Sequence, residues 1–168
     1  HEPPMPDPQF IADLMLGKLS RKLRMLGYDT LYSQRMDDPT LLKRAVGEDR
    51  QILTRKTCLI NRQESRGITL FIKDNDPSKQ IIEVIEHYKL TINPLIIGTR
   101  CLICNEKLKA TPVDQVESQI PDYVISTQKH FSACPRCNKI YWKGTHYENM
   151  LKTVKQIEGK PMENTSKI

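Results

Sequence analysis

Two cysteine pairs, Cys101-Leu-Ile-Cys104 and Cys134-Pro-Arg-Cys137, stand about thirty residues apart in the second half of the chain. Two residues between a pair of thiols allow both sulfurs to face one metal ion, and four thiolates complete the tetrahedral shell of Zn²⁺. An asparagine follows each pair, so the two turns resemble each other. We therefore expect a small zinc ribbon held by Cys101, Cys104, Cys134 and Cys137.

A full shell of four thiolates leaves no position for a metal-bound water, so we expect this zinc to hold the fold rather than to catalyse. The length of 168 residues fits a medium domain with a small appended one. We expect a linker over residues 1–8, an α/β domain over 9–97, the zinc ribbon with a closing helix over 98–158, and a flexible tail over 159–168.

Composition favours a soluble intracellular protein. The net charge of +6 is mildly basic and tolerates anionic partners without proving one. No apolar run approaches the roughly twenty residues of a membrane helix, so no membrane is expected as a partner. The proline-rich start resembles a linker excised from a longer chain. We expect the fifth cysteine, Cys58, to be a buried free thiol, which together with the zinc spacing indicates a reducing compartment.

Short apolar runs alternate with helical patterns before the cysteine pairs. Strands are expected at residues 9–12, 28–32, 51–54 and 68–72, with helices between them and a last helix capped by Asp76. This alternation predicts a parallel sheet with helices on both faces, whose ligands gather beyond the carboxyl ends of the strands. Between the cysteine pairs we expect an edge strand or a loop near residues 120–124, and after them a helix over 147–157.

Three carboxylates, Asp13, Asp37 and Asp38, are expected at the carboxyl edge of this sheet. Crowded oxygen ligands suit Mg²⁺ or Mn²⁺, which activate water and neutralise the charge of a phosphodiester. The alternative is structural: Asp38 caps a helix, Asp37 belongs to a turn, and only Asp13 lacks such a duty.

The helix expected over residues 14–26 carries cations without a single acidic residue among them. These are Lys18, Arg21, Lys22 and Arg24. The alternatives are a solvated helix face and a surface that contacts a phosphate backbone.

Further motifs accompany the cysteine pairs: Phe10-Ile-Ala-Asp13, Leu26-Gly-Tyr-Asp-Thr30, Leu53-Thr-Arg55 and Tyr141-Trp-Lys-Gly-Thr-His146. Together they resemble the Mut-seven C-terminal ribonuclease-domain family over residues 9–150. The resemblance implies a PIN-like α/β domain followed by a zinc ribbon. Such domains lie at the C-terminus of animal 3′-to-5′ exoribonucleases of the Mut-seven and Nibbler type, which act in small-RNA silencing.

The resemblance places the family's acidic site on Asp13 and on Asp37 or Asp38, where Mg²⁺ or Mn²⁺ is expected only if the site is active. Lys56 stands where the pattern usually has an acidic residue. An ammonium group there repels a divalent ion and is expected to pair with Asp13 instead. Nuclease activity is therefore left open.

The same signature supplies basic and aromatic residues in the ribbon. An indole can stack a base while nearby cations bind its phosphate. For Trp142 the alternative is that it packs the ribbon against the α/β domain. The expected RNA contacts of the ribbon are Arg136, Lys139, Trp142, Lys143 and His146.

The first hypothesis is an RNA-binding C-terminal module of a larger 3′-to-5′ exoribonuclease in small-RNA silencing, with a degenerate nuclease site. Its expected partners are single-stranded RNA, the exonuclease domain of the same parent chain and a silencing partner protein, in a cytoplasmic or perinuclear location. The alternatives are an active divalent-metal ribonuclease and a protein-docking module that recruits a silencing partner.

Overall fold

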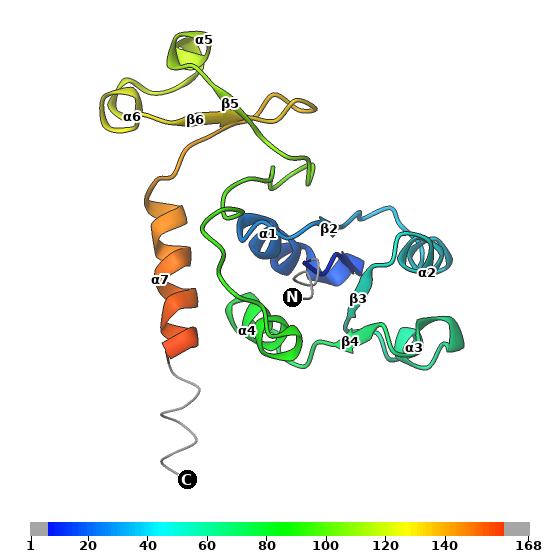
Figure 1. The fold of residues 1–168 in the computed structure, drawn as a ribbon. Helices are drawn as coiled ribbons and strands as arrows, with labels where there is room; N and C mark the ends of the chain where they lie inside the picture. The colour runs from blue at the N-terminus through cyan, green and yellow to red at the C-terminus, as the bar shows by residue number, and fades with distance from the viewer. Residues whose placement is uncertain (1–6, 160–168) are drawn as a thin grey trace, which may run out of the picture. The chain divides into compact units, whose positions relative to one another are not determined.

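The computed structural model describes residues 7–159, and these form two compact units whose boundary falls between Thr91 and Ile92 (Figure 1). Most of the expected linker and tail thus lies outside the described residues. No helix within the described part combines the length and the apolar character needed to cross a membrane. The two units are described separately below.

The first unit is built on a four-stranded sheet in which all neighbouring strands are parallel. Its strands are β1 (Phe10–Ala12), β2 (Thr30–Leu31), β3 (Gln51–Thr54) and β4 (Thr69–Phe71). The order β2-β1-β3-β4 means that the chain leaves β1 toward one edge and later crosses to the other side. In parallel sheets, ligands gather beyond the carboxyl ends of the strands where the order reverses in this way.

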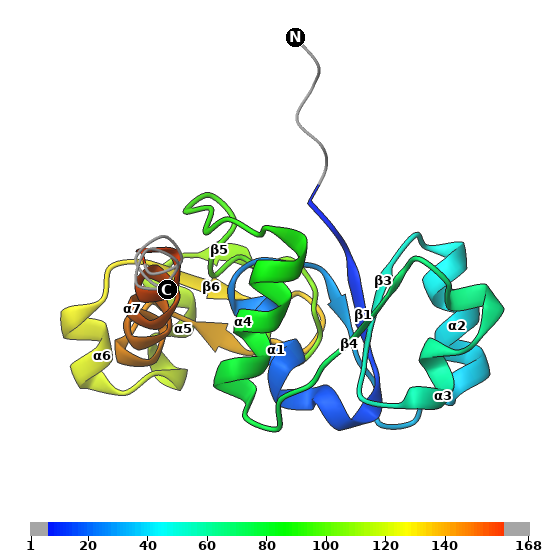
Figure 2. The same cartoon turned by 90° about the horizontal axis from the view of Figure 1, so that it is seen from below.

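Helices cover both faces of this sheet, as expected (Figure 2). One face carries α1 and α4, and the other carries α2 and α3. The helical elements are η1 (Leu14–Leu16), α1 (Gly17–Met25), α2 (Asp38–Gly47), α3 (Thr57–Ile60), η2 (Gln63–Ser65) and α4 (Pro77–Tyr88).

The core of the first unit lies on both sides of the sheet because neighbouring residues of β1 point to opposite faces. Phe10 makes edge-to-face contacts with Tyr28 and with Tyr88 of α4. Ile11 belongs to a buried cluster on the other face with residues of α2, β3 and α3. The strands therefore read as continuous apolar runs rather than alternating ones.

The start of α2 corrects the expected cap. Asp37, not Asp38, is the capping residue: its carboxylate accepts a hydrogen bond of 2.8 Å from the Thr40 amide. This hydrogen bonding from Thr40 lowers the pKa of Asp37. Asp38 is instead the first helical residue, which leaves its side chain available for another partner. Asp76 caps α4 as expected.

The second unit contains an antiparallel sheet in the order β5-β6-β7. Its elements are β5 (Lys109–Thr111), α5 (Val113–Val116), η3 (Glu117–Gln119), α6 (Asp122–Thr127), β6 (Phe131–Ala133), β7 (Ile140–Tyr141) and α7 (Thr145–Gly159). The helix α7 confirms the expected closing helix and begins two residues before it.

The expected edge strand or loop near residues 120–124 is wrong, because this segment runs into α6. Val116, Ile120 and Val124 are spaced four residues apart, and all three are buried against Phe131. They do not lie on one helix: Val116 ends α5, Ile120 is extended, and Val124 belongs to α6. Short helical turns joined by an extended residue therefore bring the three side chains together.

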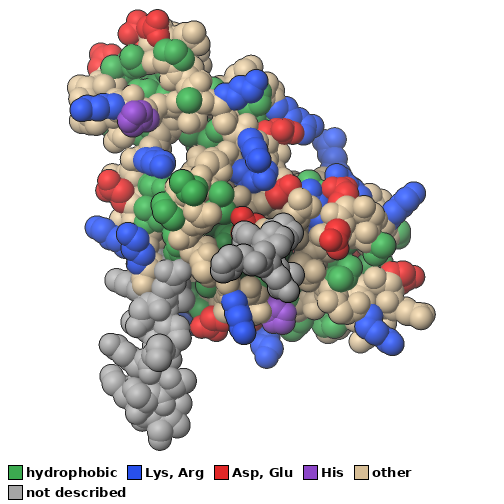
Figure 3. Space-filling view, viewed as in Figure 1, with side chains coloured by type: hydrophobic (Ala, Val, Ile, Leu, Met, Phe, Trp, Pro, Cys, Tyr) green, Lys and Arg blue, Asp and Glu red, His purple; other side chains and the backbone are tan. Residues whose placement is uncertain are grey.

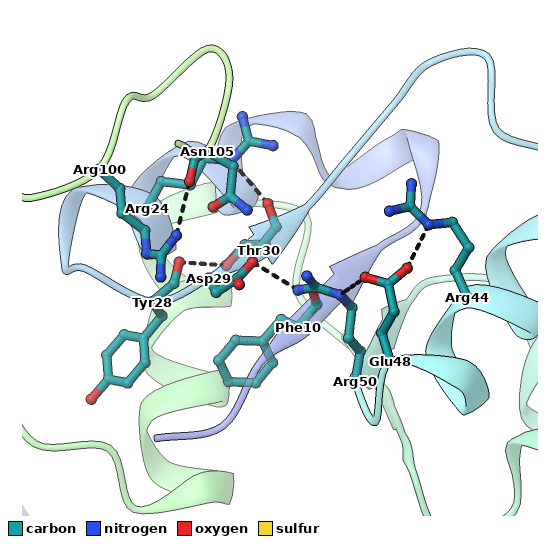
Figure 4. A network of polar contacts seen from close by, with 10 residues as sticks. All are labelled: Phe10, Arg24, Tyr28, Asp29, Thr30, Arg44, Glu48, Arg50, Arg100 and Asn105. Carbon is teal, nitrogen blue, oxygen red and sulfur yellow. Dashed lines mark hydrogen bonds and ion pairs between the residues drawn. The ribbon is translucent and has the colours of Figure 1, made fainter. Parts of the chain in front are cut away.

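Arg50 ties together the start of the first unit's sheet (Figure 4). Its buried guanidinium group donates 3.0 Å hydrogen bonds to the Phe10 carbonyl and to Glu48, and forms a 2.8 Å ion pair with Asp29. Glu48 in turn pairs with the exposed Arg44 at 2.7 Å. The planar guanidinium fork therefore links β1 to the loops before β2 and β3.

We expect Arg50→Ala to lower the free energy of unfolding by about 2 kcal/mol, because it removes charge-assisted hydrogen bonds and leaves the Phe10 carbonyl without this donor. Arg44→Ala is the matched control: it removes an exposed pair to the same Glu48 and should cost less than about 0.5 kcal/mol. Urea unfolding followed by circular dichroism measures both. Equal losses would contradict the special role of Arg50.

Candidate functional site

The two cysteine pairs occupy turns with the same backbone hydrogen bonds. In the first turn the Cys101 amide donates to Glu106 O at 2.8 Å, and the Asn105 amide donates to Cys101 O at 2.9 Å. The second turn repeats this pattern, with Cys134 to Lys139 O and Asn138 to Cys134 O, both at 2.9 Å. The two asparagines have φ angles of 68° and 65°, in the left-handed region that asparagine tolerates better than most residues. The repeated asparagine thus has a structural cause.

Backbone amides of both turns point at sulfur. The Cys104 amide donates to Cys101 Sγ at 3.4 Å, and the amides of Arg136 and Cys137 donate to Cys134 Sγ at 3.4 and 3.5 Å. Such hydrogen bonds orient metal ligands and stabilise their thiolate form. The turns are therefore built to present thiolates rather than merely to reverse the chain.

The four sulfurs lie within 4.8 Å of one another, and Cys101 Sγ is 3.7 Å from Cys137 Sγ. Zinc–sulfur bonds of about 2.3 Å in a tetrahedron place the sulfurs about 3.8 Å apart. The cluster consequently fits a zinc ion. Within the described part of the chain, no other group of three or more histidine, cysteine or carboxylate side chains could hold a metal.

Tyr141 is a sulfur-orienting residue that the sequence reasoning missed. Its hydroxyl oxygen accepts a 3.0 Å hydrogen bond from the Leu102 amide, which leaves the hydroxyl proton to point at Cys101 Sγ, 3.2 Å away. Burial opposes the thiolate of Cys101, but the hydrogen bonds from Tyr141 and from nearby amides outweigh it and lower its pKa to about 7. Forty residues separate Tyr141 from Cys101, so no local spacing could have revealed the contact.

Two of the other thiols, those of Cys104 and Cys134, have raised pKa values and resist ionisation. Burial, followed by the neighbouring Cys137 and Cys101, raises the pKa of Cys104 to about 12. Burial is also the largest cause that raises the pKa of Cys134. Crowded thiolates repel each other, and a divalent cation bound among them would remove that repulsion.

The carboxyl edge of the first unit holds Asp13, which is 1% exposed and follows β1. Its Oδ1 accepts a 2.9 Å hydrogen bond from the Met15 amide, and its Oδ2 accepts hydrogen bonds from the Thr54 hydroxyl at 2.5 Å and the Arg55 amide at 2.8 Å. Asp13 therefore caps η1 and joins β1 to the end of β3. The expectation that Asp13 has no structural duty is wrong.

Lys56 pairs with Asp38 rather than with Asp13, which corrects the expected ion pair. The Lys56 ammonium lies 2.9 Å from Asp38 Oδ1, and both side chains are about three-quarters buried. The hydrogen bond to Asp38 is the largest cause that raises the pKa of Lys56, to which the charge of Asp13 adds. A cation of the chain itself therefore stands among the carboxylates of this edge, while Asp37 is occupied with its helix cap.

The cations expected on α1 divide into two groups. Lys18 and Arg21 are exposed and Lys22 is half-buried, and none of the three forms an ion pair with another described residue. Arg24 is only 4% exposed, and its Nε donates a 2.9 Å hydrogen bond to Thr30 O. The expectation that Arg24 lies on the basic face is wrong, because its side chain holds the start of β2.

The basic residues expected in the ribbon are exposed, but its indole is packed inward. Lys139 and Lys143 are exposed and lie over the rings of Tyr141 and Tyr147, with Nζ 5.5 and 5.3 Å from the ring centres. Arg136 is exposed and forms a long 3.9 Å contact with Glu106.

Trp142 is half-buried and meets Phe131 edge-to-face at 6.2 Å, within the core of the second unit. The side chain of His146 lies outside the described residues.

Cys58 is exposed on α3, so the expectation of a buried thiol is wrong. The helix α3 has only four residues, Thr57–Ile60, and buries Leu59 alone. A helix of this length buries only one side chain here. The apolar residues beside Cys58 therefore do not make Cys58 a buried residue.

We expect Cys101→Ser to lose stoichiometric zinc and the folded core of the second unit, because three thiolates and a hydroxyl bind zinc far more weakly. Cys58→Ser is the matched control, since it removes an exposed thiol outside the cluster. Zinc content and the emission of Trp142, the one tryptophan of the chain, measure the outcome. Full zinc content and unchanged emission in Cys101→Ser would contradict the assignment.

Comparison with protein families gives one result: the model of the Mut7-C RNAse domain matches residues 8–154. Neither a curated protein nor a solved structure matches the chain. The match covers both units, from before β1 into α7, and agrees with a parallel α/β unit followed by a four-cysteine cluster. The chain therefore belongs to the Mut7-C RNAse domain family, which indicates a ribonuclease-related function.

Proposed function

We propose that this chain is an RNA-binding module of a larger 3′-to-5′ exoribonuclease that acts in small-RNA silencing, and that its own nuclease site is degenerate. Its partners in this proposal are single-stranded RNA, the exonuclease domain of the parent chain and a silencing partner protein. A cytoplasmic or perinuclear place of action belongs to the same proposal. Zinc has a structural part in it.

The observation that carries the proposal is the basic face of α1, whose cations form no ion pair with another described residue. Lys18, Arg21 and Lys22 lie within two turns of one helix, and α1 contains no acidic residue. Cations that serve only solubility are usually interspersed with carboxylates, whereas unneutralised cations on one face attract phosphates. Figure 3 shows one face of the protein, on which Lys and Arg side chains are scattered. Arg136, Lys139 and Lys143 are exposed and supply further cations for phosphate contacts in this proposal.

The ion pair between Lys56 and Asp38 supports a degenerate nuclease site. A divalent ion needs several converging oxygen ligands, and an ammonium 2.9 Å from one of the candidate carboxylates competes for that ligand. Asp13, Asp37 and Asp38 do not form a group of three ligands among the described residues. Substrate binding without cleavage follows from such an arrangement.

The second candidate is an active ribonuclease that uses Mg²⁺ or Mn²⁺. Two features favour it: the description of the family and the position of Asp13 at the carboxyl edge beside the end of β3. In this case Asp13 and Asp38 are the ligands, and Lys56 moves aside when the metal binds. A module that only docks a silencing partner remains as the outcome if RNA neither binds nor is cut.

We expect Arg21→Glu/Lys22→Glu to weaken binding to single-stranded RNA at least about tenfold and to reduce its dependence on salt, because phosphate contacts release bound counterions. The matched control is Arg62→Glu/Arg66→Glu, which makes the same change in charge at exposed positions flanking η2, on the other face of the sheet. Fluorescence anisotropy at several salt concentrations measures both. Equal losses in the two variants would show that net charge, rather than this helix face, determines affinity.

We expect end-labelled single-stranded RNA to stay intact in the presence of the zinc-loaded protein and Mn²⁺, and to shift on a native gel. Cleavage that stops in Asp38→Asn would place the active ribonuclease first. This substitution is preferable to Asp13→Asn as the first test, because Asp13 also holds the fold. Intact RNA without a native shift would favour the docking module.

A further inference from the structure

Leu14 and Met15 are neighbouring apolar residues that the fold leaves open to solvent, with exposed fractions of 46% and 59%. No other large apolar residues that are both exposed stand next to each other in the described part of the chain. They follow Asp13 directly and form the start of η1, at the carboxyl end of β1. Single exposed apolar residues are ordinary, whereas a contiguous exposed apolar site indicates an interaction surface.

The turn that carries this apolar pair is held firmly. The carboxylate of Asp13 caps the Met15 amide, and the Leu16 amide donates a 3.0 Å hydrogen bond to the Asp13 carbonyl. The Tyr32 hydroxyl donates a 2.7 Å hydrogen bond to the Leu14 carbonyl. The conformation of the turn is therefore set before any partner arrives, which lowers the entropy cost of binding.

Gly17 protects this arrangement. A Cβ atom at Gly17 would lie 3.0 Å from the Tyr32 hydroxyl oxygen and 3.1 Å from the adjacent ring carbon. A side chain there requires the end of Tyr32, whose hydroxyl binds the Leu14 carbonyl, to shift by a few tenths of an ångström. A buried carboxylate, a tyrosine hydroxyl and a glycine thus hold the turn that exposes Leu14 and Met15 to solvent.

The apolar pair adjoins the basic face of α1. Met15 precedes Lys18 by three residues, and Lys18 precedes Lys22 by four, a rise of about 6 Å along a helix. The cations of α1 thus begin three residues after Met15, so a partner that covers Leu14 and Met15 lies near them along the chain. It must combine negative charge with flat apolar surface, and an RNA strand with unpaired bases does so in every nucleotide.

We propose that Leu14 and Met15 contact an unpaired nucleobase of the strand whose phosphates bind Lys18, Arg21 and Lys22, and that this contact selects single-stranded RNA over duplex. The inference rests on the proposed function and deepens it by naming the residues that distinguish a single strand from a duplex. The thioether of Met15 packs favourably against aromatic rings, as bases are. In a duplex the base faces are stacked inside, so only the phosphates remain to be bound.

The test compares single-stranded RNA with a duplex of the same sequence, using the zinc-loaded chain and fluorescence anisotropy at several salt concentrations. We expect Leu14→Ser/Met15→Ser to weaken single-strand binding about tenfold, with duplex affinity and the salt dependence of binding unchanged. Val46→Ser is the control, because Val46 is 58% exposed but lies on α2. Leu14→Lys/Met15→Lys adds positive charge and should raise duplex affinity while it still lowers the preference for single strands.

Equal losses for single strand and duplex, or no loss for either, would overturn the base contact while RNA binding through Arg21 and Lys22 stands. Absence of any RNA binding by the unmodified chain would overturn the proposed function together with this inference. Binding to phosphatidylserine vesicles that depends on Leu14 and Met15, with an unchanged preference between the two RNAs, would assign the apolar pair to a membrane surface instead.

Discussion

The carboxylate of Asp13 is the interaction on which the carboxyl edge of the first unit depends. It is almost fully buried, and it binds the start of η1 with one oxygen and the end of β3 with the other. A buried carboxylate is tolerated only when hydrogen bonds replace its lost hydration, and three donors do so here. The same group thus fixes the spacing of the two central strands and the direction in which the chain leaves β1. A residue that resembles a metal ligand in sequence is, in this fold, first a connection between elements.

In the second unit, cysteine sulfurs rather than a buried carboxylate join the elements. Its sheet has strands of only two or three residues, and its apolar core centres on four buried residues. So small a core does not supply enough hydrophobic free energy to fold alone, and a metal cluster is the usual supplement. The left-handed asparagines, the amides aimed at sulfur and the Tyr141 hydroxyl all prepare thiolates for a cation. We therefore expect a zinc ion held by the four cysteines to stabilise this unit.

Much of the fold could be predicted from the sequence because its signals are local. The strand at residues 51–54, the cap at Asp76 and the paired cysteines each depend on residues close together in the chain. The helices between β5 and β6 were missed because they are short turns among many polar residues and share no continuous helical period. Whether Asp37 or Asp38 caps α2 depends on the residue at which the helix begins. Two adjacent aspartates in a sequence do not reveal that residue.

The candidate site was less predictable because its contacts join distant residues. The charge of Asp13 acts on Lys56, but the ion pair forms with Asp38 at the start of α2. Arg24 continues the basic pattern of α1 in sequence, but the position of Thr30 O draws it inward. Tyr141 reaches Cys101 across the ribbon. In each case the residue type was informative, and the partner was set by tertiary structure.

The inward arginines also change what the formal charge of this protein means. Arg24, Arg50 and Arg55 direct their guanidinium groups at backbone carbonyls, and Arg50 adds two carboxylates. These cations contribute to the charge of +6 but serve as internal crosslinks between strands and loops. An approaching polyanion meets a smaller set of exposed lysines and arginines. The isoelectric point of such a protein therefore includes arginines that crosslink the fold as well as exposed cations that can bind nucleic acids.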